Sequence, residues 1–421
     1  MSSAVAIPSH AALAATYSAV RQRSLDLCAP LTPEDMMVQS CPEASPAKWH
    51  LAHTAWFFES FVLTPFLSGY QPFHKDFYWL FNSYYATFAY FPEKKLRASF
   101  SRPALSEVLG YRAHVDEAIA RLLASDAPEE ALRRIDLGIN HEEQHQELLL
   151  TDILHAFFTN PLRPAYCADG QPLPALNQKP APLEFLDYTG GLRQVGHEGE
   201  RFCYDNELPR HPVWLEPYTL ASRLITCEEY VAFIADGGYR RQELWLSAGW
   251  DTVKAQGWQA PLYWTARDDD WTIFTLRGEL PLSTLRSTPV AHVSFYEADA
   301  YARWAGARLA TEFEWEAASD NAPGNLLESG LLLPAPALNQ NAASMQSIGD
   351  VWEWTASAYL GYPGYKAAAG ALGEYNGKFM SGQMVLRGGS CVTPRRHIRP
   401  SYRNFFVPET RWQFSGIRLA K

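Results

Sequence analysis

A proline-rich segment divides this 421-residue chain into two parts with different sequence patterns. Six prolines fall from position 161 to position 182. That density excludes a continuous helix, because proline lacks the backbone N–H and its ring clashes with the preceding turn. A chain of this length also exceeds what one ordinary core accommodates. We therefore predict a domain of residues 1–160, a linker of residues 161–185 and a second domain of residues 186–421.

The first part carries the patterns of four long helices. Apolar residues recur near helical spacing in 11–27, and Ser45-Pro46 precedes a second helical stretch, 47–63. Segments 105–124 and 129–158 show the same character. Four such helices with a long connection at 64–104 predict a bundle. Bundles place metal ligands on facing helices.

His141 and His145 are four residues apart within the last of these helices. At 3.6 residues per turn the two imidazoles share one face, and imidazole suits zinc, iron, copper or nickel. The pair alone is a weak signal, because histidines also occur on solvated helix faces. His53 on the second predicted helix offers a third ligand. His50 lies three residues before it, near the same face, so spacing alone leaves His50 open as an alternative.

The second part is predicted to be loop-rich, with short strands and glycine-rich turns. Eleven of the 14 tryptophans lie here, and large aromatic side chains can fill an irregular core. Helices are predicted only at 226–235 and 296–305, since stretches such as 236–290 and 319–347 show no period. The predicted fold class is α+β, a helical bundle followed by a loop-rich domain.

Composition and charge exclude several classes of protein. The net charge of −10 argues against nonspecific nucleic-acid binding, which needs a basic surface. No apolar run approaches the roughly 20 residues of a membrane span. Residues 1–17 lack the basic start and apolar core of a signal peptide. The six scattered cysteines fit neither a zinc ribbon nor a disulfide framework. We therefore expect a cytoplasmic protein with reduced thiols.

Longer motifs connect both parts to known families. The first part resembles DinB-like four-helix domains through Ser45-Pro46-x-x-Trp49-x-Leu51-x-His53 and His141-x-x-x-His145-x-Glu147. The second part resembles the C-type-lectin-like fold of formylglycine-generating enzymes, or sulfatase-modifying factors. Its motifs include Trp304-Ala305-Gly306-x-Arg308-Leu309, Gly349-Asp350-Val351-Trp352-Glu353-Trp354 and Arg387-Gly388-Gly389-Ser390. The two modules in this order resemble the EgtB-type sulfoxide synthases of ergothioneine biosynthesis.

This resemblance implies a non-heme Fe(II) enzyme that uses O2. It implies that His53, His141 and His145 hold the iron. The reaction would join the sulfur of a cysteine-type thiol to carbon 2 of the imidazole of hercynine (N-alpha-trimethylhistidine), giving a sulfoxide. Three neutral ligands would leave the metal site positively charged, which favours an added thiolate.

The resemblance also implies roles for residues around the metal. Gln144 and Asn404 match positions that contact hercynine. Either Tyr84 or Tyr85 would donate a proton near the metal, and Arg97 or Arg102 would hold the carboxylate of the thiol substrate. Phe406 departs from one branch of the family, in which an acid holds the amino group of gamma-glutamylcysteine. This departure favours free cysteine as the sulfur donor.

Other interpretations stay open at this point. The same chemistry could use gamma-glutamylcysteine, unmethylated histidine or a selenium donor. A DinB-type zinc thiol transferase would need no O2, and a lectin-like module would only bind. Formylglycine generation is not expected, because Cys391 has no nearby cysteine partner. Glu142, Glu143 and Glu147 are expected to be solvated, with Glu147 alternatively a partner of an imidazole. The oligomeric state is not predicted.

Overall fold

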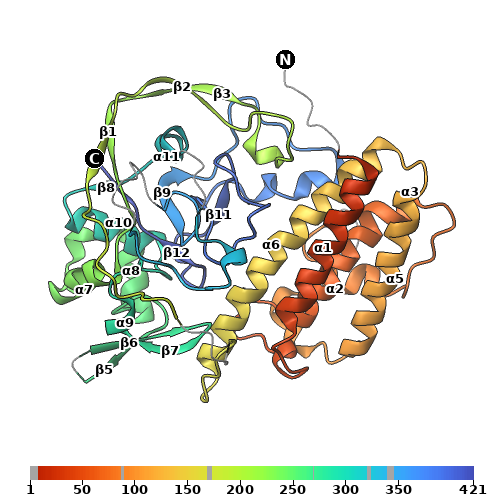
Figure 1. Ribbon diagram of the computed structural model, residues 1–421, viewed down its shortest axis with the longest axis horizontal. Coiled ribbons are helices and arrows are strands. Elements are labelled where there is room, and N and C mark those ends of the chain that lie inside the picture. Colours follow the sequence, from red (N-terminus) through yellow and green to blue (C-terminus); the bar gives the residue numbers. More distant parts are fainter. Residues whose placement is uncertain (1–7, 87–89, 168–172, 269, 320–323, 339–345) are drawn as a thin grey trace.

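The computed structural model describes residues 8–86, 90–167, 173–268, 270–319, 324–338 and 346–421. Part of the predicted N-terminal segment (1–7) and part of the predicted linker (168–172) lie outside these residues. The first half is helical and packs along one side of the second half, with the longest helix between them (Figure 1).

Four long helices form a bundle in the first half: α1 (His10–Cys28), α2 (Ala47–Phe58), α5 (Leu105–Leu123) and α6 (Glu129–Thr159). Helix α2 contacts both α5 and α6, and every one of its residues is buried. The helices pack closely where Gly138 of α6 faces Phe58, since a Cβ at position 138 would lie 2.4 Å from the Phe58 ring. A glycine inside a helix is therefore required by packing here.

The ends of these helices follow from local chemistry. Ser9 caps α1 by accepting a hydrogen bond from the Ala12 N–H. Glu129 and Glu130 occupy the first turn of α6, where negative charge is favoured by the helix dipole. Helix α6 ends at Thr159, just before Pro161. The predicted helix over 47–63 is continuous, but its last part is a π-helical turn, η2 (Glu59–Leu63).

The connection between α2 and α5 contains short helical pieces: α3 (Thr64–Phe66), α4 (Phe77–Leu80) and the 3-10 helix η3 (Lys94–Ser99). It brings Phe81, Tyr84 and Tyr85 back against the bundle, where Phe81 and Tyr85 are fully buried in its core. A segment without a regular pattern thus places side chains next to His53 and Trp56 of α2.

The second half is built from small sheets. One has the order β1-β4-β13-β8 and another the order β11-β10-β9-β12; β2 pairs with β3, and β5, β6 and β7 form a three-stranded sheet. The strands are β1 (Phe185–Tyr188), β2 (Gly191–Val195), β3 (His211–Leu215), β4 (Tyr218–Ala221), β5 (Trp264–Arg267), β6 (Asp270–Thr275), β7 (Gly278–Pro281), β8 (Arg308–Leu309), β9 (Trp352–Ala358), β10 (Met384–Arg387), β11 (Asn404–Phe406), β12 (Ser415–Gly416) and β13 (Leu419–Ala420).

Both predicted helices of the second half are present, as α7 (Cys227–Ala235) and α10 (Phe295–Trp304). Three further helices are α8 (Ser247–Gln256), α9 (Leu282–Leu285) and α11 (Glu312–Ala318). The prediction that 236–290 holds no helix is therefore wrong, because α8 and α9 lie there, whereas β5–β7 are short strands of the predicted kind. Helix α11 begins with a capping box in which Thr311 and Glu314 satisfy each other's backbone N–H groups.

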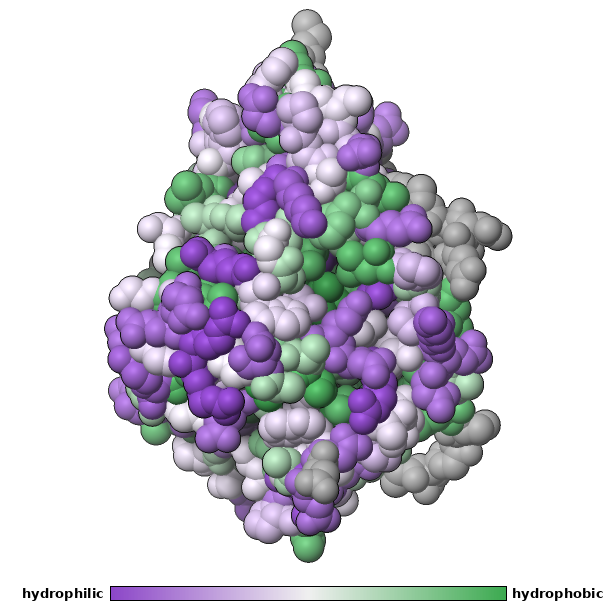
Figure 2. All heavy atoms as spheres, turned by 90° about the vertical axis from the view of Figure 1, so that its left-hand side faces the viewer, coloured by the Kyte–Doolittle hydropathy of each residue, from purple (hydrophilic) through white to green (hydrophobic). Residues whose placement is uncertain are grey.

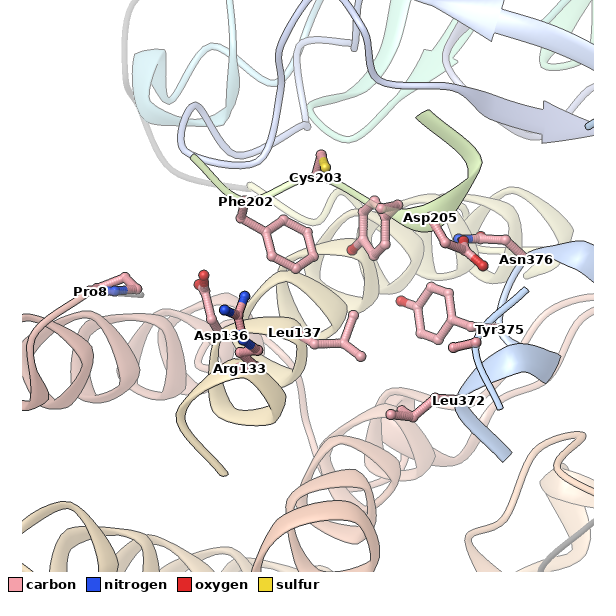
Figure 3. A pocket seen from close by; sticks show the side chains of 12 residues that line it. Pro8, Arg133, Asp136, Leu137, Phe202, Cys203, Asp205, Leu372, Tyr375 and Asn376 are labelled. Atoms are coloured by element: carbon pink, nitrogen blue, oxygen red, sulfur yellow. The ribbon is translucent and has the colours of Figure 1, made fainter. Parts of the chain in front are cut away.

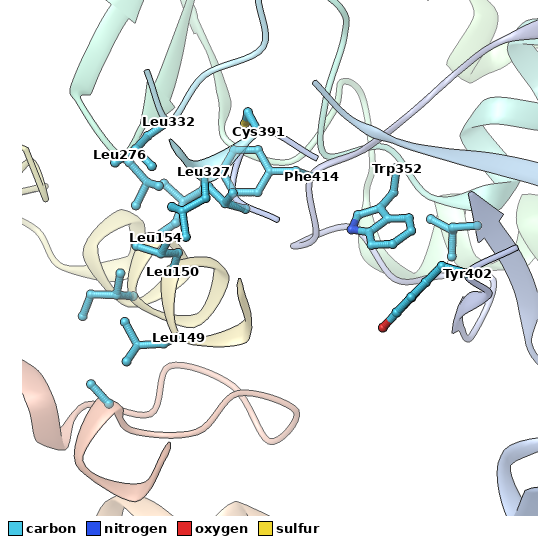
Figure 4. Close-up of a cluster of buried hydrophobic side chains, with 14 of the residues drawn as sticks. Leu149, Leu150, Leu154, Leu276, Leu327, Leu332, Trp352, Cys391, Tyr402 and Phe414 are labelled. Atoms are coloured by element: carbon cyan, nitrogen blue, oxygen red, sulfur yellow. The ribbon is translucent and has the colours of Figure 1, made fainter. Parts of the chain in front are cut away.

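The two halves share one hydrophobic core. Leu150 and Leu154 on α6 belong to the same buried cluster as Leu327, Trp352 and Phe414 of the second half (Figure 4). On the face shown in Figure 2, hydrophilic side chains surround smaller hydrophobic patches. None of the described helices combines the length and the apolar character that crossing a membrane requires. The helical first half and the loop-rich mixed second half confirm the predicted fold class.

Candidate metal centre

Three histidines converge inside the bundle. His53 comes from α2 and His141 and His145 from α6, and their ligand nitrogens all lie within 4.8 Å of one another. The Nε2 atoms of His141 and His145 are 3.1 Å apart. Two nitrogens that each lie about 2.1 Å from one ion are separated by about 3.0–3.4 Å at ordinary ligand angles. The spacing therefore suits two ligands of a single ion.

A hydrogen bond and two stacked aromatic rings hold the His53 imidazole in place. Its Nδ1 lies 2.7 Å from the Phe81 carbonyl oxygen, so Nδ1 carries the proton and Nε2 is free to bind a metal. The imidazole stacks between Trp49, 4.4 Å away, and Trp56, 5.3 Å away. The Arg97 guanidinium covers the other face of Trp49 at 3.4 Å. This stack fixes the direction of the free nitrogen.

His50 is oriented differently from the other three. Its Nδ1 lies 2.8 Å from Nδ1 of His145, and its Nε2 lies 3.1 Å from Oδ2 of Asp152. Both ring nitrogens of His50 are thus engaged by other side chains, and His50 is not in the group that converges. The geometry favours His53 as the third ligand.

Burial keeps these imidazoles neutral. It lowers the pKa of His141 to about 3 and holds the pKa values of His53 and His145 well below the usual 6.5. A neutral imidazole has a lone pair for a metal, whereas a protonated one has none. The cluster is therefore in its ligand form at neutral pH.

A cavity of about 480 Å³ opens beside the histidines, between α6 and the second half. Of the residues predicted for the site, Tyr84, Arg97, Gln144 and Asn404 line it together with His141 and His145. Further lining residues are His50, Lys94, Asp152, Trp352, Tyr375, Phe379, Tyr402, Phe405, Phe406, Trp412 and Gln413. The structure therefore brings most of the predicted site residues around one space.

Three predicted residues do not line the cavity: Tyr85, Arg102 and His53, which is buried next to His141 and His145. Tyr85 is fully buried behind Tyr84, and the two hydroxyl oxygens are 3.4 Å apart. Only Tyr84 reaches the cavity. Arg102 is exposed and does not line the cavity, whereas Arg97 is buried and donates to the hydroxyls of Ser45 and Ser83 at 2.8 and 3.0 Å.

Gln144 is held by two tyrosines that the sequence did not assign to the site. Its Nε2 donates to the Tyr402 hydroxyl at 2.7 Å, and its Oε1 accepts from the Tyr375 hydroxyl. Tyr402 lies two residues before Asn404, a predicted site residue, so its position in the sequence is a usable signal. No sequence motif points to Tyr375. The fold brings its ring to 5.7 Å from the ring of His141.

Tyr375 also separates this cavity from a second pocket of about 240 Å³. That pocket lies between the first half of α6, the loop that carries Phe202 and the 3-10 helix η8 (Gly370–Glu374), which carries Leu372 (Figure 3). The two spaces share Tyr375 and Asn376, but none of the predicted site residues lines the second one.

The expectation that the glutamates of α6 are solvated is wrong. Glu142 accepts hydrogen bonds from Arg21, Arg112 and Ser24, and Glu143 pairs with Arg396. Glu147 accepts from Trp352, Ser390 and Thr393, and none of its hydrogen bonds within the described residues involves an imidazole. The reason is that α6 packs against α1 and α2 and also contacts residues of the second half, such as Trp352 and Arg396.

Comparisons with known proteins agree with this architecture. Residues 16–155 match the DinB superfamily, and residues 174–329 and 331–421 match the sulfatase-modifying factor enzyme 1-like domain. The hercynine oxygenase of Mycolicibacterium thermoresistibile is 32% identical over 99% of this chain and 96% of its own length. The chain belongs to the hercynine oxygenase family.

Other relatives support this membership. A hercynine oxygenase of Mycolicibacterium smegmatis is 35% identical over 68% of this chain and 71% of its own length. A formylglycine-generating enzyme of Streptomyces coelicolor is 29% identical but covers only 52% of this chain. The predicted class, an oxidoreductase that forms a C–S bond in ergothioneine biosynthesis, is confirmed at the level of the family.

All six cysteines lie in the described part of the chain, and none forms a disulfide.

Proposed function

We propose that His53, His141 and His145 hold Fe(II), and that the enzyme joins the sulfur of free cysteine to carbon 2 of hercynine with O2 as oxidant. The observation that carries this proposal is the convergence of the three imidazoles at a cavity that also presents Tyr84, Gln144 and Asn404. In such a site Fe(II) supplies O2 activation and an attachment point for the thiolate.

The proposed reaction balances without a further reductant. The C–H bond at carbon 2 of hercynine and the S–H bond of cysteine break, and a C–S bond and an S–O bond form. One oxygen atom of O2 enters the sulfoxide and the other leaves as water with the two hydrogens. Carbon and sulfur together lose the four electrons that O2 accepts.

The cavity offers suitable partners for hercynine. The amides of Gln144 and Asn404 can donate to its carboxylate while staying neutral. Aromatic rings of Trp352, Tyr402 and Trp412 line the same space, and aromatic faces attract quaternary ammonium groups. Nε2 of Gln413 is buried and has no partner among the described residues, which favours a polar ligand in this cavity.

The thiol end favours free cysteine. Phe406 lines the cavity with its ring 6.5 Å from that of Trp412, so an apolar side chain stands where gamma-glutamylcysteine would need an acid. Arg97 and Lys94 lie on the same cavity and can hold the carboxylate of cysteine. Asp152 and Glu43, which also line it, are candidates for the ammonium group.

Phe406→Asp is expected to raise kcat/KM for gamma-glutamylcysteine about 10-fold or more, because a charge-assisted hydrogen bond contributes about 1.5–3 kcal/mol. Steady-state assays with both thiols measure this. Phe406→Leu keeps an apolar side chain and controls for the loss of the ring. If Phe406→Asp gains no activity toward gamma-glutamylcysteine, the argument for free cysteine fails.

Tyr84→Phe is expected to lower kcat about 10²-fold with little change in KM, because Tyr84 lines the cavity, Tyr85 does not, and proton donors contribute at least this much. Burial raises the pKa of Tyr84 to about 12, so the phenol holds its proton at neutral pH. Tyr85→Phe is the matched comparison and should lose far less. A larger loss in Tyr85→Phe would reverse the assignment.

The proposed function is tested with protein that is loaded with Fe(II) without oxygen and then given hercynine and each thiol. Mass spectrometry follows the product after O2 is admitted. We expect a sulfoxide of hercynine and cysteine that forms only with iron and O2. The same protein loaded with Zn²⁺ tests the thiol transferase alternative, which would give product without O2. Histidine and selenocysteine in place of the substrates test the remaining alternatives.

A further inference from the structure

The three imidazoles that converge differ in the hydrogen-bond partners of their Nδ1 atoms. His53 donates from Nδ1 to a neutral backbone carbonyl, that of Phe81. Nδ1 of His141 is buried and has no hydrogen-bond partner among the described residues. Nδ1 of His145 meets another imidazole, that of His50, at 2.8 Å. Only His145 is therefore connected to a charged group, because His50 continues to Asp152.

The proton positions along this chain follow from the metal site. If Nε2 of His145 binds the ion, its Nδ1 carries the proton and donates to Nδ1 of His50. His50 then has its own proton on Nε2, which donates to Oδ2 of Asp152 at 3.1 Å. The Asp152 carboxylate has a second donor, the backbone N–H of Ser45 at 2.8 Å. Every link has one donor and one acceptor.

The fold also fixes this relay, the hydrogen-bonded series His145–His50–Asp152. His145 and Asp152 are seven residues apart on α6, two turns along one face, and His50 reaches across from α2. His50 and Asp152 are both largely buried, which limits the competition of water for these hydrogen bonds. Ser45 precedes α2, and its N–H ties the start of that helix to Asp152.

We propose that His50 and Asp152 are positioning residues that orient His145 and strengthen it as a ligand. This inference rests on the proposed function, since it needs a metal at the three histidines. A carboxylate that accepts through an imidazole sets the tautomer of the ligand and raises its basicity, and loss of such a partner commonly costs 10–100-fold in metal affinity. His50 acts through His145 and does not bind the ion itself.

The test measures metal binding rather than turnover. Metal-free wild-type protein, Asp152→Asn and His50→Gln are titrated with Co²⁺ and with Fe²⁺ under anaerobic conditions, and the Co²⁺ absorption spectrum is recorded. Asp152→Asn keeps the shape of the side chain and removes the charge. We expect each variant to bind metal about 10–100-fold more weakly and to shift the Co²⁺ spectrum. The double variant should lose no more than His50→Gln alone, because both act through one path.

His155→Gln is the matched control, since His155 lies on the same helix and bonds to Ser40 instead. It should bind metal as tightly as wild type. Circular dichroism checks that each variant folds. If Asp152→Asn does not fold, the proposal is tested with His50→Gln alone. Unchanged affinity and spectrum in the folded variants would overturn the relay alone. Wild-type protein that binds neither metal would instead contradict the metal site and the proposed function.

Discussion

His53→Ala is expected to abolish stoichiometric iron binding and, with it, sulfoxide formation. The remaining ligands, His141 and His145, form only a helical i,i+4 pair. The metal site then has two protein nitrogens in place of three, so it binds iron more weakly. Iron analysis of protein loaded anaerobically and then desalted measures the effect. The bundle should still fold, although the emptied space between Trp49 and Trp56 will lower stability.

His50→Ala tests whether His50 is a metal ligand or a positioning residue. It should weaken metal binding without abolishing it, because His50 contacts His145 and not the ion. His155→Ala should leave the iron content unchanged. If His50→Ala loses all iron while His53→Ala retains it, the two histidines have been assigned to the wrong roles.

The largest effect on stability is expected for Glu142→Ala, a loss of about 3–5 kcal/mol in the free energy of unfolding. The Glu142 carboxylate lies 2.9 Å from Arg21 and 2.9 Å from Arg112, all three side chains being buried. Without it, only Asp116, which pairs with Arg21, remains to balance the two guanidinium groups. Urea denaturation at neutral pH measures the difference.

Glu130→Ala is the matched control on the same helix. Glu130 pairs with Arg134 at the surface, and exposed i,i+4 pairs contribute only about 0.3–0.5 kcal/mol. An equal loss for the two variants would contradict the buried network.

The contribution of Glu142 should also depend on pH. Burial acts to raise its pKa, but Arg21, Arg112 and Ser24 outweigh burial and lower the pKa from 4.5 to about 2. A group whose pKa is depressed by folding stabilises the protein above its unfolded pKa. The stability difference between wild type and Glu142→Ala should thus be complete above about pH 4.5 and shrink as the pH falls toward 2.

The helical half was readable from sequence because its signals are local. The i,i+4 spacing of His141 and His145, the Ser45-Pro46 start and the end of α6 before Pro161 each depend on neighbouring residues. The convergence with His53 then needed only the rule that bundles place ligands on facing helices. These three residues remain a prediction until metal binding is measured.

What the sequence could not provide is burial by distant segments. Glu142 and Glu147 look like solvated helix charges, and only contacts with Arg21 and Trp352, far away in sequence, show otherwise. Arg97 and Arg102 were equivalent in sequence, and the fold alone separates them. Helix α11 is a different case, since its Thr311–Glu314 capping box is a local signal that predicts the start of a helix.

In the proposed function, three histidines hold an iron that uses O2 to join cysteine to hercynine. The most direct measurement gives iron-loaded wild-type protein both substrates and isotopically heavy O2, and determines the mass of the product. We expect a hercynine–cysteine sulfoxide that carries one heavy oxygen atom and is absent in His53→Ala. A product that forms without O2, or no such product from protein with iron bound, would contradict the account.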